Sequence, residues 1–325
     1  MLYREALNKA LDEAMSLDDS VVTLGEDVGL YGGTFRVTEG LVEKYGQKRV
    51  IDTPIAELSI VGNAVGMAIG GLRPVAEIMT GNFALLAFDQ IINHMAKLHY
   101  MSNGKITLPM VVRFPQGVSK QLGAQHSESY EQMLSSVPGL KVLSVSDVNY
   151  AYHALKYAIF SDDPIIFIEH ELLYNKKGTV NFDEKINPLK ARRVKEGDDI
   201  TIVSYLKMVD DVMESVPQIE EALSCSCEVI DLCALNPIDY ETLATSLKKT
   251  SRLVVVEEDH KMGGYGAQVV AWAVEEMFYE LDAPPLRLAG ADVPIAYNRK
   301  LELASIPTPD SIAQDIIAWG EKNGL

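Results

Sequence analysis

A single acidic residue stands where a helix is expected to begin. Glu57 ends the run Asp-Thr-Pro-Ile-Ala-Glu, and the helix predicted to follow carries glycines at positions 62, 66 and 70. Apolar neighbours would shield this carboxylate from water. An acid so placed can share a proton with a basic ring nitrogen near neutral pH. The alternative is a glutamate that the helix macrodipole favours in a first turn, with no further role.

The three glycines recur every four residues and therefore share one face of the predicted helix. Each glycine inside a helix costs roughly 1 kcal/mol relative to alanine, so three in register need a reason. Close approach by another helix supplies one, either within this chain or at a subunit interface, and the sequence leaves both open. The chain shows no recognisable cradle for a phosphate or its metal. It therefore reads as one half of a shared active site.

Met79 and Phe83 follow the next predicted strand. A flexible thioether and an aromatic ring at the carboxyl end of a strand can form a slot for a flat heterocycle. Residues of these two types are also common in ordinary cores. We expect them to contact a ring-shaped ligand near Glu57.

His126 is the only imidazole in a long polar loop, residues 117–130, that follows another predicted strand. Long loops at strand ends are often functional, and histidine exchanges protons near neutral pH. A surface histidine without a function is the alternative. We predict that His126 takes part in the chemistry.

The composition excludes several classes of protein. At 325 residues, 47% of them apolar, the chain can form two domains with substantial cores. The net charge of -17 argues against nucleic acid as a partner, because phosphate binding needs basic surfaces. The sequence has no apolar stretch of the length that spans a membrane. Its three cysteines, without a fourth metal ligand nearby, suit a reducing compartment.

Apolar runs alternate with amphipathic helices along the chain, a pattern typical of α/β folds with largely parallel sheets. In the first half we expect strands at residues 21–24, 74–79, 109–114, 141–145 and 164–168, and helices near 2–15, 58–70, 84–101 and 148–160. In the second half we expect strands at 200–205, 228–232, 252–257 and 286–289, and helices near 208–223, 239–249, 266–280 and 309–321.

A polar, turn-rich segment separates the two halves. We expect a first domain at residues 1–175, a linker at 176–198 and a second domain at 199–325. Gly263, Gly264 and Gly266 in the second domain loosely suggest a dinucleotide-binding turn, but they do not fit the Gly-x-Gly-x-x-Gly spacing. An interaction loop or a domain contact is the better interpretation of these glycines.

Several runs together resemble the β subunit of thiamine-diphosphate-dependent 2-oxo acid dehydrogenases. They are Leu-Gly-Glu-Asp-Val at residues 24–28, Asp-Thr-Pro-Ile-Ala-Glu at 52–57, Gly-Leu-Arg-Pro at 71–74, Phe-Asp-Gln-Ile at 88–91, Ala-Gln-His-Ser at 124–127, Gly-Gly-Tyr-Gly at 263–266 and Ala-Asp-Val-Pro at 291–294. They span nearly the whole chain in the same order. The runs at residues 120–123 and 169–175 look most like those of bacterial and plastid pyruvate dehydrogenases.

The resemblance implies a pyrimidine-binding domain followed by a transketolase-type C-terminal domain. It implies that Glu57 hydrogen-bonds the aminopyrimidine ring of thiamine diphosphate and favours the imino tautomer needed to activate the cofactor. Met79 and Phe83 match side chains that pack on the pyrimidine. His126 matches a histidine at the active-site channel, where it would orient the substrate or assist acyl transfer to lipoamide.

The same resemblance divides the cofactor site between two chains. Diphosphate and Mg²⁺ are expected in a partner α subunit, through a Gly-Asp-Gly motif that this chain lacks, since it has only Gly-Asp-Asp at residues 197–199. An α2β2 heterotetramer follows, with the C-terminal domain docking a dihydrolipoyl acyltransferase core. The expected location is the cytoplasm, or the plastid stroma if a transit peptide has been removed.

Some relatives also hold K⁺ through carbonyl oxygens near a helix end. The matching residues here are Ala158, Ile159 and Asp163, while Ser161 replaces an acid common in those relatives. A monovalent cation at this place is the corresponding expectation.

The substrate most compatible with the resemblance is pyruvate. Acetoin or a branched-chain 2-oxo acid remains an alternative within the same chemistry. A single-chain transketolase would need its own diphosphate motif, which is absent from the sequence. A non-catalytic assembly subunit is the alternative from another class, and replacing Glu57 would distinguish it because a scaffold would keep full activity.

Overall fold

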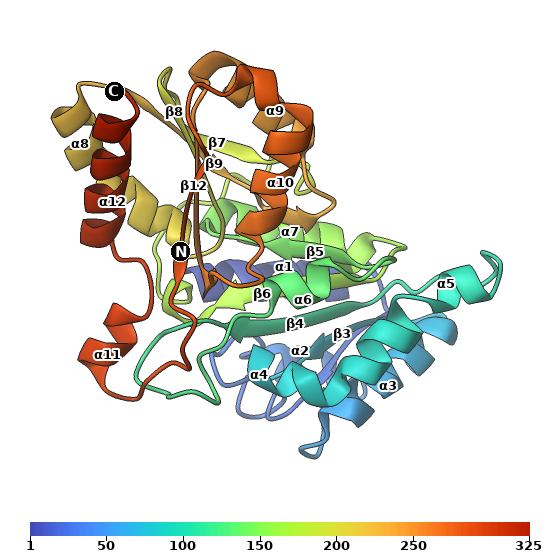
Figure 1. Cartoon of the computed structure of the whole chain (residues 1–325). Helices are drawn as coiled ribbons and strands as arrows, with labels where there is room; N and C mark the ends of the chain where they lie inside the picture. The colour runs from blue at the N-terminus through green and yellow to red at the C-terminus, as the bar shows by residue number, and fades with distance from the viewer. The chain divides into compact units, whose positions relative to one another are not determined.

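The computed structural model describes residues 1–325, which form two compact units. The first unit comprises residues 1–116 and 133–188, and the second comprises residues 117–132 and 189–325. Figure 1 colours the chain from its N-terminus to its C-terminus. The segment 117–132, which contains His126, therefore folds with elements that come much later in the sequence. The expected domain limits of 1–175 and 199–325, with a linker between them, stay a prediction.

A wholly parallel arrangement of six strands forms the centre of the first unit. The strands are β1 (Val21–Gly25), β2 (Val50–Asp52), β3 (Arg73–Glu77), β4 (Val111–Gln116), β5 (Lys141–Ser144) and β6 (Ile165–His170). Their spatial order is β5-β6-β4-β3-β1-β2. Because parallel strands are covered on both faces, most of these segments contain a continuous apolar run rather than an alternating pattern, although Glu77, Arg113 and Glu169 are buried charged exceptions. These apolar runs predicted β1, β3, β4, β5 and β6, whereas the three-residue strand β2 was not predicted.

Helices cover this first sheet. They are α1 (Tyr3–Leu17), α2 (Leu41–Tyr45), α3 (Glu57–Ile69), α4 (Gly81–Ala84), η1 (Leu85–Ala87), η2 (Gln90–Met95), α5 (Leu98–Met101), α7 (Val148–Phe160) and η3 (Glu171–Leu173), with the short α6 (Glu131–Ser135) where the two units meet in the sequence. Helix α1 packs against α7, and α3 packs against β3, η1 and η2. Helix α3 thus lies directly over the strands whose ends carry the candidate site.

The segment expected to form one helix at residues 84–101 is interrupted instead. A 3₁₀ turn at η1 leads into a π-helix at η2, and α5 forms only after a further turn. Each change of hydrogen-bond spacing rotates the following side chains relative to an ideal α-helix. Apolar periodicity predicts helical backbone here but does not distinguish these three hydrogen-bond patterns.

The second unit has a mixed sheet in the order β12-β11-β8-β9-β7. Its strands are β7 (Arg192–Lys195), β8 (Ile200–Ser204), β9 (Cys227–Asp231), β11 (Leu253–His260) and β12 (Leu286–Gly290), and only the edge strand β7 runs antiparallel to its neighbour. The three-residue strand β10 (Ala234–Asn236) follows β9. Strand β7 falls inside the expected linker, and its polar sequence Arg-Arg-Val-Lys has no apolar signal that would have revealed it.

Helices lie on both faces of this second sheet, as Figure 1 shows. Helices α8 (Met208–Leu223) and α12 (Pro309–Lys322) pack together on one face and bury an aliphatic core that includes Val212, Ile219 and Ile316. Helices α9 (Tyr240–Thr250) and α10 (Gly266–Glu276) lie on the other face, followed by η4 (Phe278–Glu280) and later by α11 (Arg299–Ala304). The two faces together confirm the expected α/β architecture.

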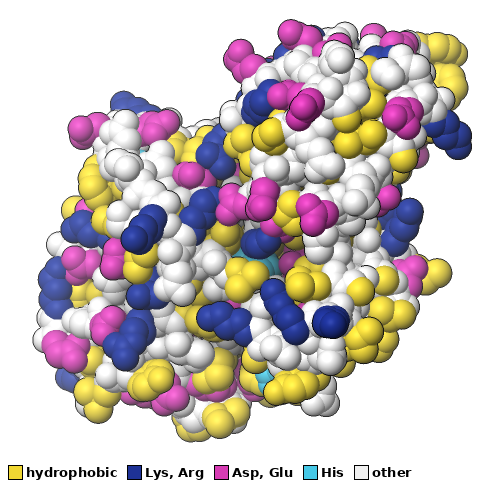
Figure 2. Space-filling view, turned by 90° about the vertical axis from the view of Figure 1, so that its left-hand side faces the viewer, with side chains coloured by type: hydrophobic (Ala, Val, Ile, Leu, Met, Phe, Trp, Pro, Cys, Tyr) yellow, Lys and Arg dark blue, Asp and Glu magenta, His cyan; other side chains and the backbone are white.

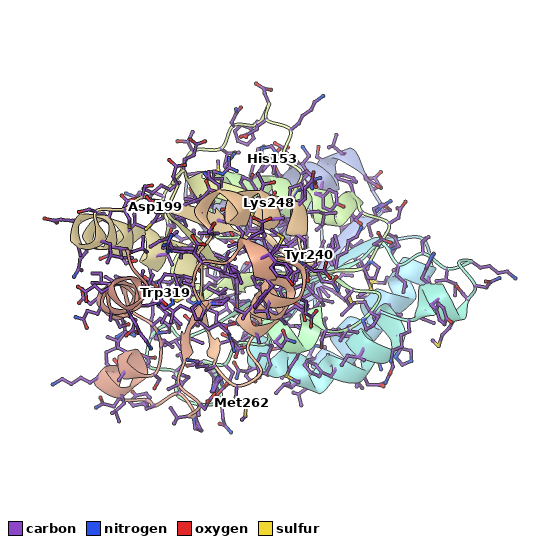
Figure 3. All side chains as sticks on the ribbon, turned by 45° about the horizontal axis from the view of Figure 1, so that its top comes forward. His153, Asp199, Tyr240, Lys248, Met262 and Trp319 are labelled. Carbon is purple, nitrogen blue, oxygen red and sulfur yellow. The ribbon has the colours of Figure 1, made fainter.

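Aromatic residues of α9, α10 and α12 make directed contacts in the second unit. Tyr240, labelled in Figure 3 at the start of α9, stacks on Trp272 of α10 with ring centroids 4.9 Å apart. Trp319 of α12, also labelled there, donates its indole N–H to the carbonyl oxygen of Pro284 at 3.0 Å. Each ring therefore contributes apolar burial and also one directed contact.

The surface carries charges of both signs. In Figure 2, Lys and Arg side chains are interspersed with acidic and hydrophobic ones on the face shown. No helix of the chain combines the length and the apolar character that crossing a membrane requires.

Candidate functional site

Glu57 is the first residue of α3 and is almost completely buried, with 4% of its surface exposed. The preceding loop is held to the sheet, because Thr53 donates its N–H to the carbonyl oxygen of Gly25 at 2.9 Å. Asp52, which opens the motif, accepts a 2.6 Å hydrogen bond from the N–H of Gly29. Asp52 and Thr53 therefore anchor the start of the motif by hydrogen bonds. Glu57, at its end, lies at the carboxyl edge of the first sheet.

Glu26 is a second acidic residue at this edge, and the sequence analysis did not select it. It follows β1 and is buried. Burial first, and then the charges of Glu57 and Asp27, raise the pKa of Glu26. Glu57 thus contributes to the electrostatic environment of Glu26. The signal was present in the run Leu-Gly-Glu-Asp-Val, which was used only for the family resemblance.

Buried polar atoms without a hydrogen-bond partner mark the same edge. They are Glu26 Oε1, Thr53 Oγ1 and Thr80 Oγ1, which follow the carboxyl ends of β1, β2 and β3. These three strands are adjacent in the order β3-β1-β2. A buried polar atom that lacks a partner costs free energy, so such a cluster fits a polar ligand that supplies the missing contacts. Ligands of open parallel sheets bind at this edge.

Met79 and Phe83 border the same edge. Met79 lies between β3 and α4, and Phe83 belongs to α4. Both are only partly buried, although Ile78 and Ala84 beside them are fully buried. The two side chains thus provide apolar surface next to the unpartnered oxygen of Thr80. Glu57 follows β2, and Met79 and Phe83 follow β3, the two strands on either side of β1, so all three lie at the same edge of the first sheet.

A buried network of ion pairs joins strands whose carboxyl ends form this edge. Arg113 of β4 donates to Glu169 of β6 through Nε at 2.7 Å and Nη2 at 2.6 Å, and it also donates to Glu77 of β3. The hydroxyl of Tyr174 donates to Glu169 at 2.7 Å. Burial raises the pKa of Glu77, and the nearby Arg113 opposes that rise. The network ties three adjacent strands together just before Met79.

His126 lies in the second unit, in the segment 117–132. It is partly exposed, and its backbone N–H donates to the carbonyl oxygen of Gly123 at 3.2 Å. Glu57 belongs to the first unit, so the expected cooperation of the two residues stays a prediction.

The residues expected to hold a monovalent cation are engaged with cationic side chains. Arg73 donates to the carbonyl oxygen of Ile159 at 3.3 Å, and Lys141 pairs with Asp163 at 2.5 Å. The carbonyl oxygen of Ala158 accepts a hydrogen bond from the N–H of Ser161. Cationic side chains therefore bind two of these three residues and a backbone N–H binds the third, so the set fits K⁺ poorly and we derive no step from such an ion.

The glycines of α3 differ in their surroundings. A Cβ added at Gly62 would lie 3.3 Å from Oε1 of Gln90, which belongs to η2, so this glycine serves a contact within the unit. A Cβ added at Gly66 would meet nothing within 4 Å. Gly66 and Gly70 are exposed. Only Gly62 is explained by packing against another element, because the atoms nearest to a Cβ at Gly70 are the backbone oxygens of Met67 and Gly66.

The glycine turn at residues 263–266 is filled by the protein itself. Gly266, at the start of α10, donates its N–H to Glu257 Oε2 at 2.6 Å, and a Cβ at this position would lie 2.6 Å from Glu257 Oε1. Glu257 is fully buried, and Arg287 also donates to it at 2.8 Å. A carboxylate at the helix N-terminus takes the place that a phosphate would need. The turn is therefore no dinucleotide site.

Comparison with known proteins identifies the family. Residues 1–177 match the family model of the pyrimidine-binding domain of transketolase, and residues 189–312 match that of the transketolase C-terminal domain. The "Pyruvate dehydrogenase E1 component subunit beta" of Gracilaria tenuistipitata var. liui is 46% identical over 97% of this chain and 98% of its own length. The chain belongs to the family of pyruvate dehydrogenase E1 component β subunits.

Other members of this E1 β family agree. The mitochondrial subunit beta-1 of Arabidopsis thaliana is 45% identical over 97% of this chain and 88% of its own length. Among solved structures, an inactive tetramer of a split-gene transketolase matches with a TM-score of 0.81 at 23% identity and covers 99% of both chains. That likeness concerns the fold, and it confirms the two transketolase-type α/β domains that the sequence predicted.

Proposed function

We propose that this chain is the β subunit of the decarboxylating component of a pyruvate dehydrogenase. Together with an α subunit, it decarboxylates pyruvate and transfers the acetyl group to the lipoamide of a dihydrolipoyl acyltransferase. Support comes from the family membership over the whole chain and from the names of its relatives. The observation that carries the proposal is the buried Glu57 at the edge where polar atoms lack partners.

Thiamine diphosphate, when bound, supplies the carbon nucleophile and the electron sink for decarboxylation. Glu57 would hold the aminopyrimidine ring by a hydrogen bond to its ring nitrogen, since a buried carboxylate at a helix N-terminus is fixed in position and shielded from water. Met79 and Phe83 would supply apolar surface to the ring. Thr53 and Thr80, whose hydroxyl oxygens lack partners, are suited to its polar substituents.

His126 would orient the 2-oxo acid or assist transfer of the acetyl group. Histidine suits this task because it can donate or accept a proton near neutral pH. Its partial exposure on a loop leaves the imidazole accessible to a substrate that arrives from solvent.

The partner proposed for this chain is an α subunit that holds the diphosphate and Mg²⁺, in an α2β2 heterotetramer. Support comes from an exposed apolar surface of α3 and η1, to which Ile55, Leu58, Ile69, Leu85 and Leu86 contribute. Ile55 is 83% exposed although it stands two residues before Glu57. Large apolar residues exposed on adjoining elements indicate an interface.

Further proposals follow from the family rather than from the geometry. The C-terminal unit would dock the dihydrolipoyl acyltransferase core, and the complex would be cytoplasmic, or stromal in a plastid. Acetoin and branched-chain 2-oxo acids are the competing substrates. No relative described above carries either of those names.

The test is replacement of Glu57 by Gln in the complex that the chain forms with its α subunit. We expect the turnover of pyruvate to fall by roughly 10²–10⁴-fold, the usual contribution of a proton-transferring side chain. Glu5→Gln is the matched control, because Glu5 also lies in a first helical turn but is exposed at the surface. Full activity of the Glu57 variant in an intact complex would mean that the chain is a scaffold. Parallel assays with pyruvate, acetoin and branched 2-oxo acids, with and without thiamine diphosphate, identify the substrate.

A further inference from the structure

The loop that carries His126 is an ordered structure. At its base, the N–H of Gly117 donates to the carbonyl oxygen of Glu128 at 3.4 Å. Near its tip, Gly123 adopts a φ of +77° and its carbonyl oxygen receives the N–H of His126. These bonds close the loop on itself. They do not by themselves fix its place in the second unit, which other residues must do.

Two buried carboxylates hold the first half of the loop. Glu258 of β11 accepts the N–H of Val118 at 2.6 Å, and Glu302 of α11 accepts the N–H of Gln121 at 2.8 Å. Hydrogen bonds to an ionised acceptor are roughly twice as strong as neutral ones. Glu302 is fully buried, so its carboxylate needs hydrogen-bond partners that offset the free-energy cost of its removal from water.

Glu302 makes a second contact that returns to the same loop. Its Oε2 accepts a 2.6 Å hydrogen bond from Arg299 Nη1, and the same nitrogen donates to the carbonyl oxygen of Ser119 at 3.1 Å. Glu302 and Arg299 thus bind the backbone of residues 119 and 121, in the part of the loop that precedes His126. Asn298 caps the start of α11 by accepting the N–H of Lys300 at 3.0 Å, which fixes the helix that carries both residues.

We propose that Glu302, together with Arg299, is a positioning residue for His126. This inference rests on the proposed function, in which His126 orients the substrate or assists acetyl transfer. Glu302 acts on the backbone of the loop and does not touch the substrate. Without it, the N–H of Gln121 and the guanidinium of Arg299 lose their shared acceptor, and the loop is free to take other positions.

The experiment compares wild type, Glu302→Ala, Glu302→Gln, Arg299→Ala, His126→Ala and the double variant Glu302→Ala with His126→Ala. Each is assayed in the assembled complex for acetylation of a lipoyl domain by pyruvate. A displacement of about 1 Å at a catalytic group can cost up to about 10²-fold, so we expect losses of about 10- to 100-fold for Glu302→Ala. In the His126→Ala background the same change should cost less than about twofold, because residues that act through one another are not additive.

Three further readouts distinguish a positioning role of Glu302 from a general loss of stability. The KM for thiamine diphosphate should stay unchanged in Glu302→Ala, because Glu57, Met79 and Phe83 belong to the first unit. Glu302→Gln keeps one carbonyl oxygen for the N–H of Gln121 and should regain part of the lost rate. Trypsin should cut after the exposed Lys120 faster in Glu302→Ala and Arg299→Ala than in wild type.

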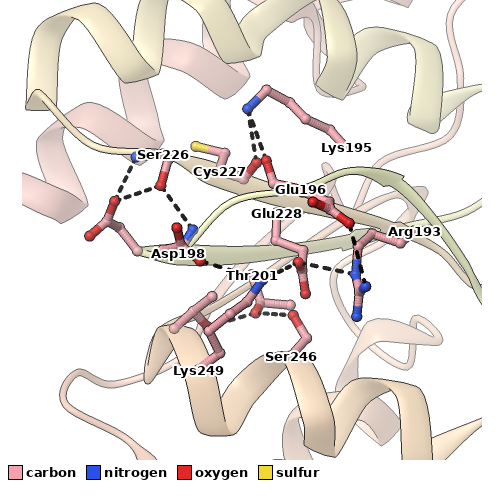
Figure 4. Close-up of polar contacts among 12 residues, drawn as sticks. Arg193, Lys195, Glu196, Asp198, Thr201, Ser226, Cys227, Glu228, Ser246 and Lys249 are labelled. Carbon is pink, nitrogen blue, oxygen red and sulfur yellow. Dashed lines mark hydrogen bonds and ion pairs between the residues drawn. The ribbon is translucent and has the colours of Figure 1, made fainter.

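Glu228 provides the matched control. It is a fully buried carboxylate of the same unit, and it pairs with Arg193 at 3.1 Å and with Lys249 at 2.5 Å. Figure 4 shows these residues. Glu228→Ala removes an equally buried charge, but its partners lie on β7 and α9 and not on the loop. We expect this variant to alter stability without exposing Lys120 to trypsin and without the coupling to His126.

Two results would overturn the proposal. One is a double variant whose loss of rate equals the product of the losses in Glu302→Ala and His126→Ala. The other is a Glu228→Ala variant with the same rate and the same tryptic cleavage as Glu302→Ala. Failure of the proposed function looks different, because the wild-type complex itself would then show no activity with pyruvate that depends on thiamine diphosphate.

Discussion

Glu26 and Glu57 illustrate how a pair of like charges comes to be buried. Both carboxylates lie at the ends of elements that meet at the carboxyl edge of the first sheet, and both are shielded from water. Burial and the neighbouring charges of Glu57 and Asp27 raise the pKa of Glu26. Buried carboxylates with a raised pKa, such as Glu26, are concentrated at functional sites.

The raised pKa of Glu26 leads to a prediction about pH. The folded state holds the proton of Glu26 more tightly than the unfolded state, so the contribution of this group to stability is present at acidic pH. It is lost as the pH rises through the folded-state pKa, above the ordinary value of 4.5. Glu26→Gln cannot ionise and should therefore gain stability relative to wild type as the pH rises. Thermal midpoints measured at about pH 4 and about pH 8 check this. A difference that does not change with pH would contradict it.

At the scale of elements, strands β3, β4 and β6 are tied together by Arg113 between Glu77 and Glu169. Burial by itself would lower the pKa of Arg113, but the two carboxylates more than offset that effect and hold it above its ordinary value. Arg113 therefore keeps its positive charge within the sheet. The network fixes the strand end from which Met79 projects.

Removal of the Arg113 guanidinium should strongly reduce the stability of the folded protein. Arg113→Ala leaves two buried carboxylates without their cation, which typically costs about 3–5 kcal/mol of the free energy of unfolding. The control is Arg36→Ala, which breaks a pair with Glu39 in which both side chains are more than half exposed, and it should cost less than about 1 kcal/mol. Denaturant unfolding is best followed by circular dichroism, since Trp272 and Trp319 both lie in the second unit. Similar losses in the two variants would refute the expectation.

At the scale of the whole molecule, α3 presents features that the chain alone does not use. Gly66 is exposed within a helix, and the large side chains of Ile55, Leu58 and Ile69 remain accessible on the same helix or just before it. Glycine and exposed aliphatic side chains are both unfavourable on an isolated helix surface. A second protein surface that covers this face would account for both.

Gly66→Ala tests whether a second protein covers this face of α3, because the substitution should have opposite effects on the isolated chain and on the complex. In the isolated chain the new methyl group meets nothing within 4 Å, so alanine should stabilise the helix. The gain should be about 0.5–1 kcal/mol, because glycine is the poorer helix former. In the complex the same methyl group should weaken association with the α subunit. Thermal unfolding of the chain and copurification of the α subunit measure the two effects. Unchanged association would place the subunit contact elsewhere.

Much of the fold followed from patterns that are local in the sequence. The apolar runs that became β1, β4, β6 and β8, and the amphipathic segments that became α7, α8 and α12, were predicted within a few residues. Such patterns work because burial on both faces of a sheet, or on one stripe of a helix, dictates the residue types within a single element. The motif that ends at Glu57 was recognised instead from an acid at the start of a glycine-containing helix and from the family resemblance.

Other features depended on residues that are remote in the chain. The sequence by itself determined the alternation of strands and helices, the family, and the acidic residue at the start of α3. Only the tertiary structure placed the segment 117–132 in the second unit and showed that Glu302 binds Gln121, which is 181 residues away. Only the tertiary structure also showed that Glu257 fills the glycine turn, and that Arg73 and Lys141 bind the Ile159 carbonyl oxygen and the Asp163 carboxylate of the expected cation site. A buried charge is held by whichever partner the fold brings to it, and no local periodicity records which residue that will be.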